Sequence, residues 1–174
     1  MRGIVLFKGK YGATEQYARW IGEGLNVPVV EEANFSSIVF HEFDYLVIGS
    51  SVYMEKLILA DWLKENKDAF KNRKLFFFIV CATPSNDKIT QDRIITENIP
   101  EAILPNCSIS FLPGRLDLKT LGFLDKCLVT FAGWFEKDLV KKKVLLNGID
   151  EVRKEHITDL LKEIETFAFS DNLQ

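Results

Sequence analysis

The sequence predicts an α/β fold in which a parallel sheet is covered by helices on both faces. Five short strand-like runs alternate with segments of helical periodicity, and this alternation is typical of strand–helix–strand units. Three of the runs, Ile4–Phe7, Leu46–Ile48 and Leu75–Val80, are continuously apolar. Strands that helices cover on both sides have this character, so these three runs should form the centre of the sheet.

The strands are predicted at Gly3–Phe7, Val27–Val30, Tyr45–Gly49, Leu75–Cys81 and Ser108–Leu112. Helices are predicted where apolar residues recur at three- and four-residue spacing, over Thr14–Leu25, Leu59–Phe70, Lys88–Asn98, Leu118–Phe135 and Lys154–Phe167. The helix over 118–135 is very apolar for a surface element. Burial on the sheet is the usual role of such a stripe, and a face that contacts a membrane or an apolar substrate is the alternative.

The composition indicates one globular domain over residues 1–174. The chain is 47% hydrophobic with a net charge of −3, which argues against a disordered tail or a nucleic-acid-binding patch. No apolar run is long enough to span a membrane and no leader segment is recognisable. The odd, widely spaced cysteines, Cys81, Cys107 and Cys127, suit a reducing compartment. A cytoplasmic protein is therefore expected, with peripheral membrane contact left open.

In an open α/β sheet, ligands bind beyond the carboxyl ends of the strands, where the strand order reverses. The first predicted strand enters the first helix through a turn with two glycines, two lysines and a hydroxyl, comprising Lys8, Gly9, Lys10, Tyr11, Gly12, Ala13 and Thr14. Free backbone N–H groups and the helix dipole favour a phosphate at such a turn. An ordinary turn with Gly12 at positive φ and Thr14 as the N-cap explains the same residues equally well. The spacing is neither the Walker nor the dinucleotide pattern, which leaves a mononucleotide.

Two further loops are predicted beside this turn. The third strand leads into a polar loop with one aromatic residue, comprising Ser50, Ser51, Val52 and Tyr53, which suits one side of a flat ring. The alternative is that Tyr53 packs beneath the following helix. The fourth strand leads into Ala82, Thr83, Pro84 and Ser85, whose backbone could bind the polar edge of a ring.

These three loops together resemble the flavodoxin family, and the resemblance covers most of the chain. The phosphate loop of that family reads hydroxyl-x-x-x-Gly-x-Thr after an apolar strand, and this sequence matches it at Gly12 and Thr14. Lys8 stands where serine or threonine is usual and Gly9 where threonine is commoner, so the charge of Lys8 or Lys10 could replace the missing hydroxyl.

The resemblance implies a three-layer, flavodoxin-like, doubly wound five-stranded parallel sheet of order 2-1-3-4-5, with helices on both faces. It also implies FMN as the cofactor, with the phosphate at residues 9–14 and the isoalloxazine ring between the other two loops. No metal site or catalytic residue is predicted, because His41 and His156 stand alone and no metal-ligand or triad spacing occurs.

Within the family, the sequence most resembles the flavodoxin-domain proteins that include the menaquinone-linked protoporphyrinogen dehydrogenase. This resemblance rests on the N-terminal segment, on residues 49–52 and on the long segment after the fifth strand. It implies an FMN-dependent oxidoreductase that reacts with a redox partner protein, an apolar substrate or a quinone. Ser50–Lys56 lacks the glycine that electron-carrier flavodoxins often have beside the flavin, which favours a dehydrogenase over a carrier. Arg115 is the candidate partner for a substrate carboxylate. An electron-carrier flavodoxin and a flavin-free interaction module are the alternatives.

Overall fold

The computed structural model describes residues 1–81, 87–118 and 146–170. Its main sheet has the order β2-β1-β3-β5-β6, in which all neighbouring pairs are parallel. In that order the strands are Val29–Glu31, Gly3–Lys8, Tyr45–Tyr53, Lys74–Cys81 and Cys107–Pro113. The predicted fold class and strand order are confirmed.

The structure contains two further short strand pairings. β4 (Lys56–Leu57) pairs with the end of β3 in antiparallel orientation. β7 (Arg115–Leu116) pairs with β8 (Ile149–Asp150) in a separate antiparallel ribbon. Neither β4 nor the ribbon was predicted, because strands of two residues are too short to show a period in the sequence.

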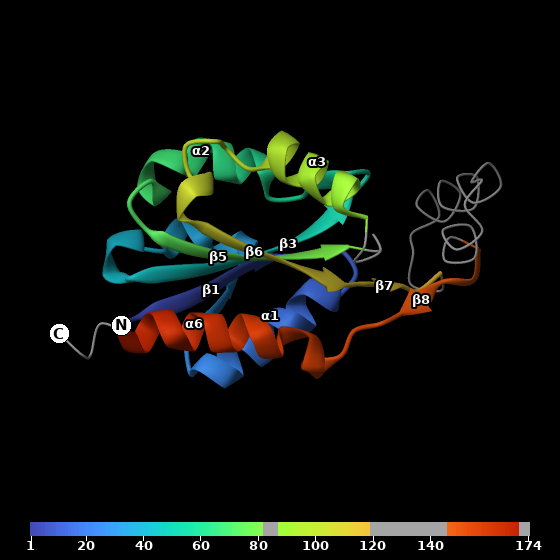
Figure 1. Ribbon diagram of the computed structural model, residues 1–174, viewed down its shortest axis with the longest axis horizontal. Helices are drawn as coiled ribbons and strands as arrows, with labels where there is room; N and C mark the ends of the chain where they lie inside the picture. The colour runs from blue at the N-terminus through green and yellow to red at the C-terminus, as the bar shows by residue number, and fades with distance from the viewer. Residues whose placement is uncertain (82–86, 119–145, 171–174) are drawn as a thin grey trace.

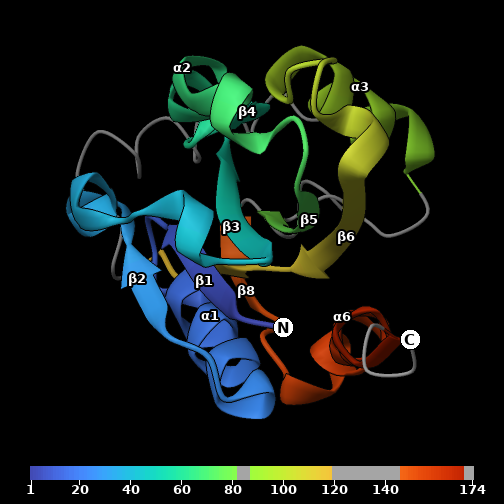
Figure 2. The same cartoon turned by 90° about the vertical axis from the view of Figure 1, so that its left-hand side faces the viewer.

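The described helices form two layers on either side of the sheet (Figure 1). α2 (Ala60–Phe70) and α3 (Lys88–Asn98) lie on one face, and α1 (Ala13–Leu25) and α6 (Thr158–Ser170) lie on the other. Short 3₁₀ turns occupy Glu32–Ser37, Phe40–Glu42, Leu104–Asn106 and Lys154–Ile157. The end-on view in Figure 2 separates the three layers.

Alternate residues of the central strands point to opposite faces and build two apolar cores. Ile4 and Leu6 of β1 join the core beneath α2 and α3, whereas Val5 and Phe7 join the core beneath α1 and α6. All four side chains are buried. Because both faces are covered, the strand needs an apolar residue at every position, which explains the continuous runs in the sequence.

The second strand begins later than predicted. The Val27 N–H donates to the Gly22 carbonyl at 3.0 Å and so completes the end of α1. Pro28 has no N–H to donate, although its carbonyl accepts from the Val5 N–H at 2.9 Å. The strand therefore covers Val29–Glu31 rather than Val27–Val30.

The third strand continues beyond its predicted end at Gly49 and reaches Tyr53. A Cβ at position 49 would lie only 2.0 Å from Cζ of Phe78, so glycine is needed where the Phe78 ring crosses β3. Gly49 is a packing glycine and not the end of the strand. The prediction of a loop over Ser50–Tyr53 is therefore wrong.

Two predictions lie outside the described residues. These are the loop Ala82–Ser85 and, beyond Leu118, the apolar helix predicted to reach Phe135. Among the residues that the structure describes, no helix is both long and apolar enough to cross a membrane.

Candidate functional site

The carboxyl ends of the parallel strands meet at one edge of the sheet, on the right in Figure 1. Lys8 at the end of β1 pairs in register with Ser50 of β3, and Ser51 pairs with Val80 near the end of β5. The turn after β1 and the end of β3 therefore lie side by side where the strand order reverses. Two of the three predicted site segments are thus adjacent.

The turn between β1 and α1 has the features of an anion site. Gly12 is the N-cap of α1 with φ of 80°, and no side chain in the described part of the structure caps the helix. A Cβ at Gly9 would lie 2.8 Å from Cβ of Thr14, so glycine lets the end of β1 approach the first turn of α1. The first N–H groups of a helix have no partner within it, and they carry the positive end of the helix dipole. The turn offers these N–H groups at the edge of the sheet.

Two buried hydroxyl groups at this edge have no hydrogen-bond partner among the described residues, namely Oγ1 of Thr14 and Oγ of Ser51. Thr14 is 1% exposed and lies inside α1, so the alternative in which it acts as the N-cap is wrong, and Gly12 is the N-cap instead. A buried polar group without a partner costs about 1–3 kcal/mol, and native folds rarely keep one without a reason. A ligand with acceptor oxygens at this edge would supply the missing partners.

Ser50 differs from Ser51 because the two side chains point to opposite faces of β3. Ser50 is fully buried, and its Oγ accepts from the Leu59 N–H at 3.3 Å and donates to the Ser51 carbonyl at 3.2 Å. These bonds attach the start of α2 to β3. The side chain of Ser50 is thereby used by the fold, and Val52 also packs against the core beneath α2.

The two lysines of the turn have different neighbours. Nζ of Lys8 lies 3.1 Å from a carboxylate oxygen of Glu32. Nζ of Lys10 lies 3.6 Å from the centroid of the Tyr53 ring and 5.4 Å from that of Tyr11. Lys10 therefore joins the turn after β1 to the end of β3.

A tight turn at Met54–Glu55 connects β3 to β4. Both residues have positive φ, 49° and 63°, which is the geometry of a type I′ hairpin. Asn98 of α3 holds the hairpin, since its Oδ1 accepts from the Leu57 N–H at 3.0 Å and its Nδ2 donates to the Glu55 carbonyl at 3.2 Å. Arg93 of α3 also pairs with the Glu55 carboxylate at 2.6 Å. Sequence reasoning missed this hairpin because its turn lacks the usual Asn-Gly signal.

Arg115 lies just beyond β6, and its Nε lies 2.8 Å from a carboxylate oxygen of Asp150. Desolvation raises the pKa of Asp150, but the hydrogen bond from the Val152 N–H and the charge of Arg115 outweigh it and hold the pKa below its ordinary value. A substrate carboxylate at Arg115 would therefore compete with Asp150.

Tyr17 of α1 is buried, and its hydroxyl has a structural role. Its hydroxyl donates to the Pro113 carbonyl at 3.0 Å, accepts from the Arg153 N–H at 3.4 Å and lies 3.2 Å from Nδ1 of His156. Burial raises the pKa of the Tyr17 hydroxyl, which keeps it protonated. These contacts attach α1 to the end of β6 and to the residues that follow β8.

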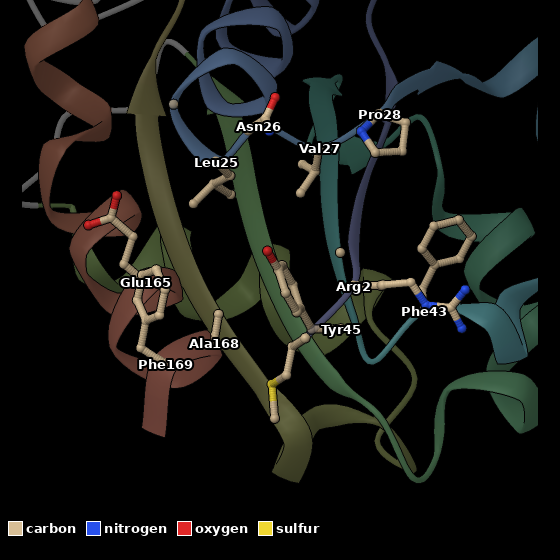
Figure 3. Close-up of a pocket in the computed structure, with 13 residues that line it drawn as sticks. Arg2, Leu25, Asn26, Val27, Pro28, Phe43, Tyr45, Glu165, Ala168 and Phe169 are labelled. Carbon is tan, nitrogen blue, oxygen red and sulfur yellow. The ribbon is translucent and has the colours of Figure 1, made fainter. Parts of the chain in front are cut away.

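A hollow of about 390 Å³ lies at the opposite, amino-terminal edge of the sheet (Figure 3). Its walls come from the starts of β1 and β3 and from the ends of α1 and α6. Tyr45 lies in this wall, and burial raises the pKa of its hydroxyl. The predicted cofactor-binding residues that the structure describes lie at the other edge, so the hollow is separate from the candidate site.

The fold and the site define a flavodoxin-like α/β protein in which the turn after β1, at the carboxyl edge of the sheet, has the features of an anion site. A model of the flavodoxin domain matches residues 4–142, and the chain belongs to this family. No curated protein sequence matches the chain.

Solved structures with a similar fold include three flavoproteins. A flavodoxin from the domain Archaea is 14% identical, with 95% of this chain and 99% of that chain covered and a TM-score of 0.45. Oxidised flavodoxin 2 from Bacillus cereus is 15% identical, with coverages of 73% and 92% and a TM-score of 0.46. A flavoprotein from Lactobacillus acidophilus in complex with FMN is 12% identical, with coverages of 65% and 92% and a TM-score of 0.46.

Membership of the flavodoxin domain family supports FMN as the cofactor. The residues present at the carboxyl edge fit its phosphate, because the turn combines a left-handed glycine N-cap with a buried threonine hydroxyl for which the described residues offer no partner. The unpaired hydroxyl of Ser51 on the neighbouring strand fits a second polar group of the same ligand.

Proposed function

We propose that this protein is an FMN-dependent oxidoreductase. The backbone of Gly9–Ala13 and the hydroxyl of Thr14 would hold the phosphate. The end of β3 would contact the ring, together with residues 82–85, which lie outside the described residues. The observation that carries the proposal is the pair of buried, unpaired hydroxyls on adjacent segments, Thr14 and Ser51. Bound FMN supplies the redox chemistry, and the protein supplies binding, orientation and electrostatic tuning.

The chain's own groups have distinct roles in this proposal. The N-terminal N–H groups of α1 and the Thr14 hydroxyl donate to the phosphate. Ser51 donates to a polar atom of the cofactor, and Tyr53 offers an aromatic contact for the ring. Ser50 keeps the start of α2 in place through Leu59 and does not contact the cofactor through its side chain.

The first test measures FMN affinity by quenching of flavin fluorescence. Thr14→Val and Ser51→Ala should each weaken binding about 5- to 30-fold, because each removes one hydrogen bond to the ligand. Ser50→Ala is the matched control, since it removes a hydroxyl from the same strand that is already bonded within the protein, and its affinity should stay within about twofold of wild type.

Unaltered FMN affinity in both Thr14→Val and Ser51→Ala would count decisively against the site. Mass spectrometry of the ligand released from native protein adds an independent check. Recovery of FAD at full occupancy, or of no flavin at all, would contradict the proposal, and the second result would favour the flavin-free interaction module.

The oxidoreductase is proposed to exchange two electrons with a large apolar partner, and protoporphyrinogen with a quinone acceptor is the pair that the sequence resemblance suggests. Two features beside the proposed ring position support this proposal. The turn after β3 contains no glycine and Asn98 fixes its backbone, which favours two-electron exchange over a one-electron carrier. Met54 in that turn is 73% exposed, which offers an apolar side chain to an incoming molecule.

Anaerobic turnover with protoporphyrinogen and a quinone tests this second part. Wild-type protein should oxidise the substrate, Tyr53→Ala should lower turnover, and Arg115→Ala should raise the KM if Arg115 leaves Asp150 to bind a substrate carboxylate. If wild type does not oxidise the substrate while a ferredoxin-linked reductase reduces its flavin in two resolved one-electron steps, the electron-carrier alternative replaces the dehydrogenase.

A further inference from the structure

The hollow at the amino-terminal edge of the sheet contains a hydroxyl group that the fold does not use. Tyr45 is 3% exposed, and in Figure 3 its hydroxyl points into the hollow, toward Leu25 and Val27. No hydrogen bond joins this hydroxyl to another residue in the described part of the chain. A buried polar group without a partner is costly and rare in native folds. A ligand in the hollow would supply the missing partner.

The ring of Tyr45, in contrast, is explained by packing. Its centroid lies 6.0 Å from that of Phe76 and 6.1 Å from that of Phe167, and both pairs have edge-to-face geometry. A Cβ at position 3 would lie 2.1 Å from Cζ of Tyr45, so Gly3 leaves room for the ring. Phenylalanine would pack in the same way, because these contacts involve the ring. The packing therefore does not account for the hydroxyl.

The walls of the hollow suit a small aromatic molecule. They include Leu25 and Val27, at and just after the end of α1, and Ala168 and Phe169, near the end of α6. Phe169 is 65% exposed, which leaves its ring available to an incoming aromatic group. A volume of about 390 Å³ with apolar walls and few polar groups is typical of a small-molecule site.

The charges around the hollow favour a positive ligand over a negative one. α1 and α6 both end here, and neither of these described helices has a basic residue in its last turn to neutralise the negative end of its dipole. Glu165 adds a carboxylate to the wall. Arg2 also lines the hollow, but in Figure 3 its guanidinium points away from the Tyr45 hydroxyl. Burial raises the pKa of Tyr45, and the negative charge of Asp44 raises this pKa further.

We propose that the hollow is a second ligand site, separate from the candidate cofactor site, and that it takes a small aromatic amine. The ring of the amine packs against Leu25, Val27 and Ala168, and an N–H donates to the Tyr45 hydroxyl. The positive charge stays at the rim near Glu165, where water also reaches it. This inference does not rest on FMN binding, because the hollow and the turn after β1 lie at opposite edges of the sheet.

Tryptamine is the probe, because it joins an indole ring and its N–H to an ammonium group, and indoleacetate is the matched anion. Dissociation constants are measured from amide chemical shifts in NMR spectra of the full chain without a terminal tag. Tryptamine should shift the amide signals of Leu25, Val27 and Tyr45. It should bind about three- to tenfold more tightly than indoleacetate, because the helix ends and Glu165 favour a cation.

Two variants test the position of the ligand. Tyr45→Phe removes only the hydroxyl and should weaken tryptamine about three- to tenfold, because one hydrogen bond is lost. Ala168→Phe places a ring in the hollow and should remove measurable binding. Thermal denaturation without ligand should give Tyr45→Phe the same Tm as wild type or a higher one, since the fold does not use the hydroxyl.

Glu165→Gln tests the charge at the rim and should reduce the preference for tryptamine over indoleacetate about two- to fivefold. Glu163→Gln is the matched control, because Glu163 is an exposed carboxylate of the same helix that does not line the hollow. The control should leave the preference of wild type unchanged.

The inference is overturned if tryptamine does not bind, if indoleacetate binds as tightly, or if Ala168→Phe binds tryptamine as wild type does. A lower Tm of Tyr45→Phe with unaltered tryptamine affinity would assign the hydroxyl to the fold instead. If only a variant that ends at Ser170 binds tryptamine, the full chain has no such site and the inference fails. A protein that binds no FMN should still bind tryptamine, so the two proposals fail independently.

Discussion

Ser50 and Ser51 are adjacent in β3, yet their hydroxyl groups have opposite surroundings. We expect Ser50→Ala to lower the free energy of unfolding by about 1–2 kcal/mol, because it leaves the buried Leu59 N–H without its acceptor. Ser51→Ala should leave the free energy of unfolding unchanged or raise it, because the buried hydroxyl that it removes has no partner in the described structure. Urea denaturation without flavin measures both. A similar loss of stability in the two variants would show that the Ser51 hydroxyl is also needed by the fold.

At the residue scale, the sequence located the turn but not the partners of its side chains. Gly12 was identifiable because a glycine just before a helix favours positive φ. The environment of Thr14 could not be identified from the sequence, since it depends on how closely Gly9 approaches Thr14. The difference between Lys8 and Lys10 also depends on residues distant in the sequence, Glu32 and Tyr53.

At the scale of elements, the hairpin of β3 and β4 retains backbone strain in a turn without glycine. Met54→Asn should raise the free energy of unfolding by about 0.5–1 kcal/mol, because asparagine tolerates the left-handed conformation that Met54 adopts. The substitution leaves the ion pair between Glu55 and Arg93 in place. Thermal denaturation should show the gain as a higher Tm.

Lys56→Asn is the control for this prediction, because Lys56 is the first exposed residue after the turn and lies in β4. It should give no gain, since asparagine is disfavoured in strands. If Met54→Asn is no more stable than wild type, contacts of the Met54 side chain offset the strain of its backbone.

The bounds of the elements were predictable where local signals set them. The predicted and observed limits of α3 coincide, since Asp87 directly before it accepts a hydrogen bond from the Thr90 N–H and so caps the helix. The end of β3 was not predictable, because Gly49 reads as a strand end unless the position of the Phe78 ring is known. Tertiary packing decided that boundary.

At the scale of the whole molecule, the order of the strands places the candidate site. β1 leads to β2 on one side and β3 lies on its other side, so the turn after β1 is open at the edge where the order reverses. The class of fold could be predicted from the continuously apolar runs. Alternate side chains of β1 pack into two separate cores, so every position of the strand is apolar. The β7–β8 ribbon, with its pair between Arg115 and Asp150, joins segments 35 residues apart, and no local pattern could predict it.

The start of β1 and the end of α6 lie together on the left of Figure 1, and the candidate site lies at the far edge. A linker joined to Met1 would therefore attach the molecule to a solid support with its carboxyl edge, and the candidate site, turned outward. An electrode coated in this way would present the carboxyl edge to dissolved partners. A cysteine placed at exposed Met54 would instead turn that edge toward the metal and shorten the path for electrons between the support and the cofactor.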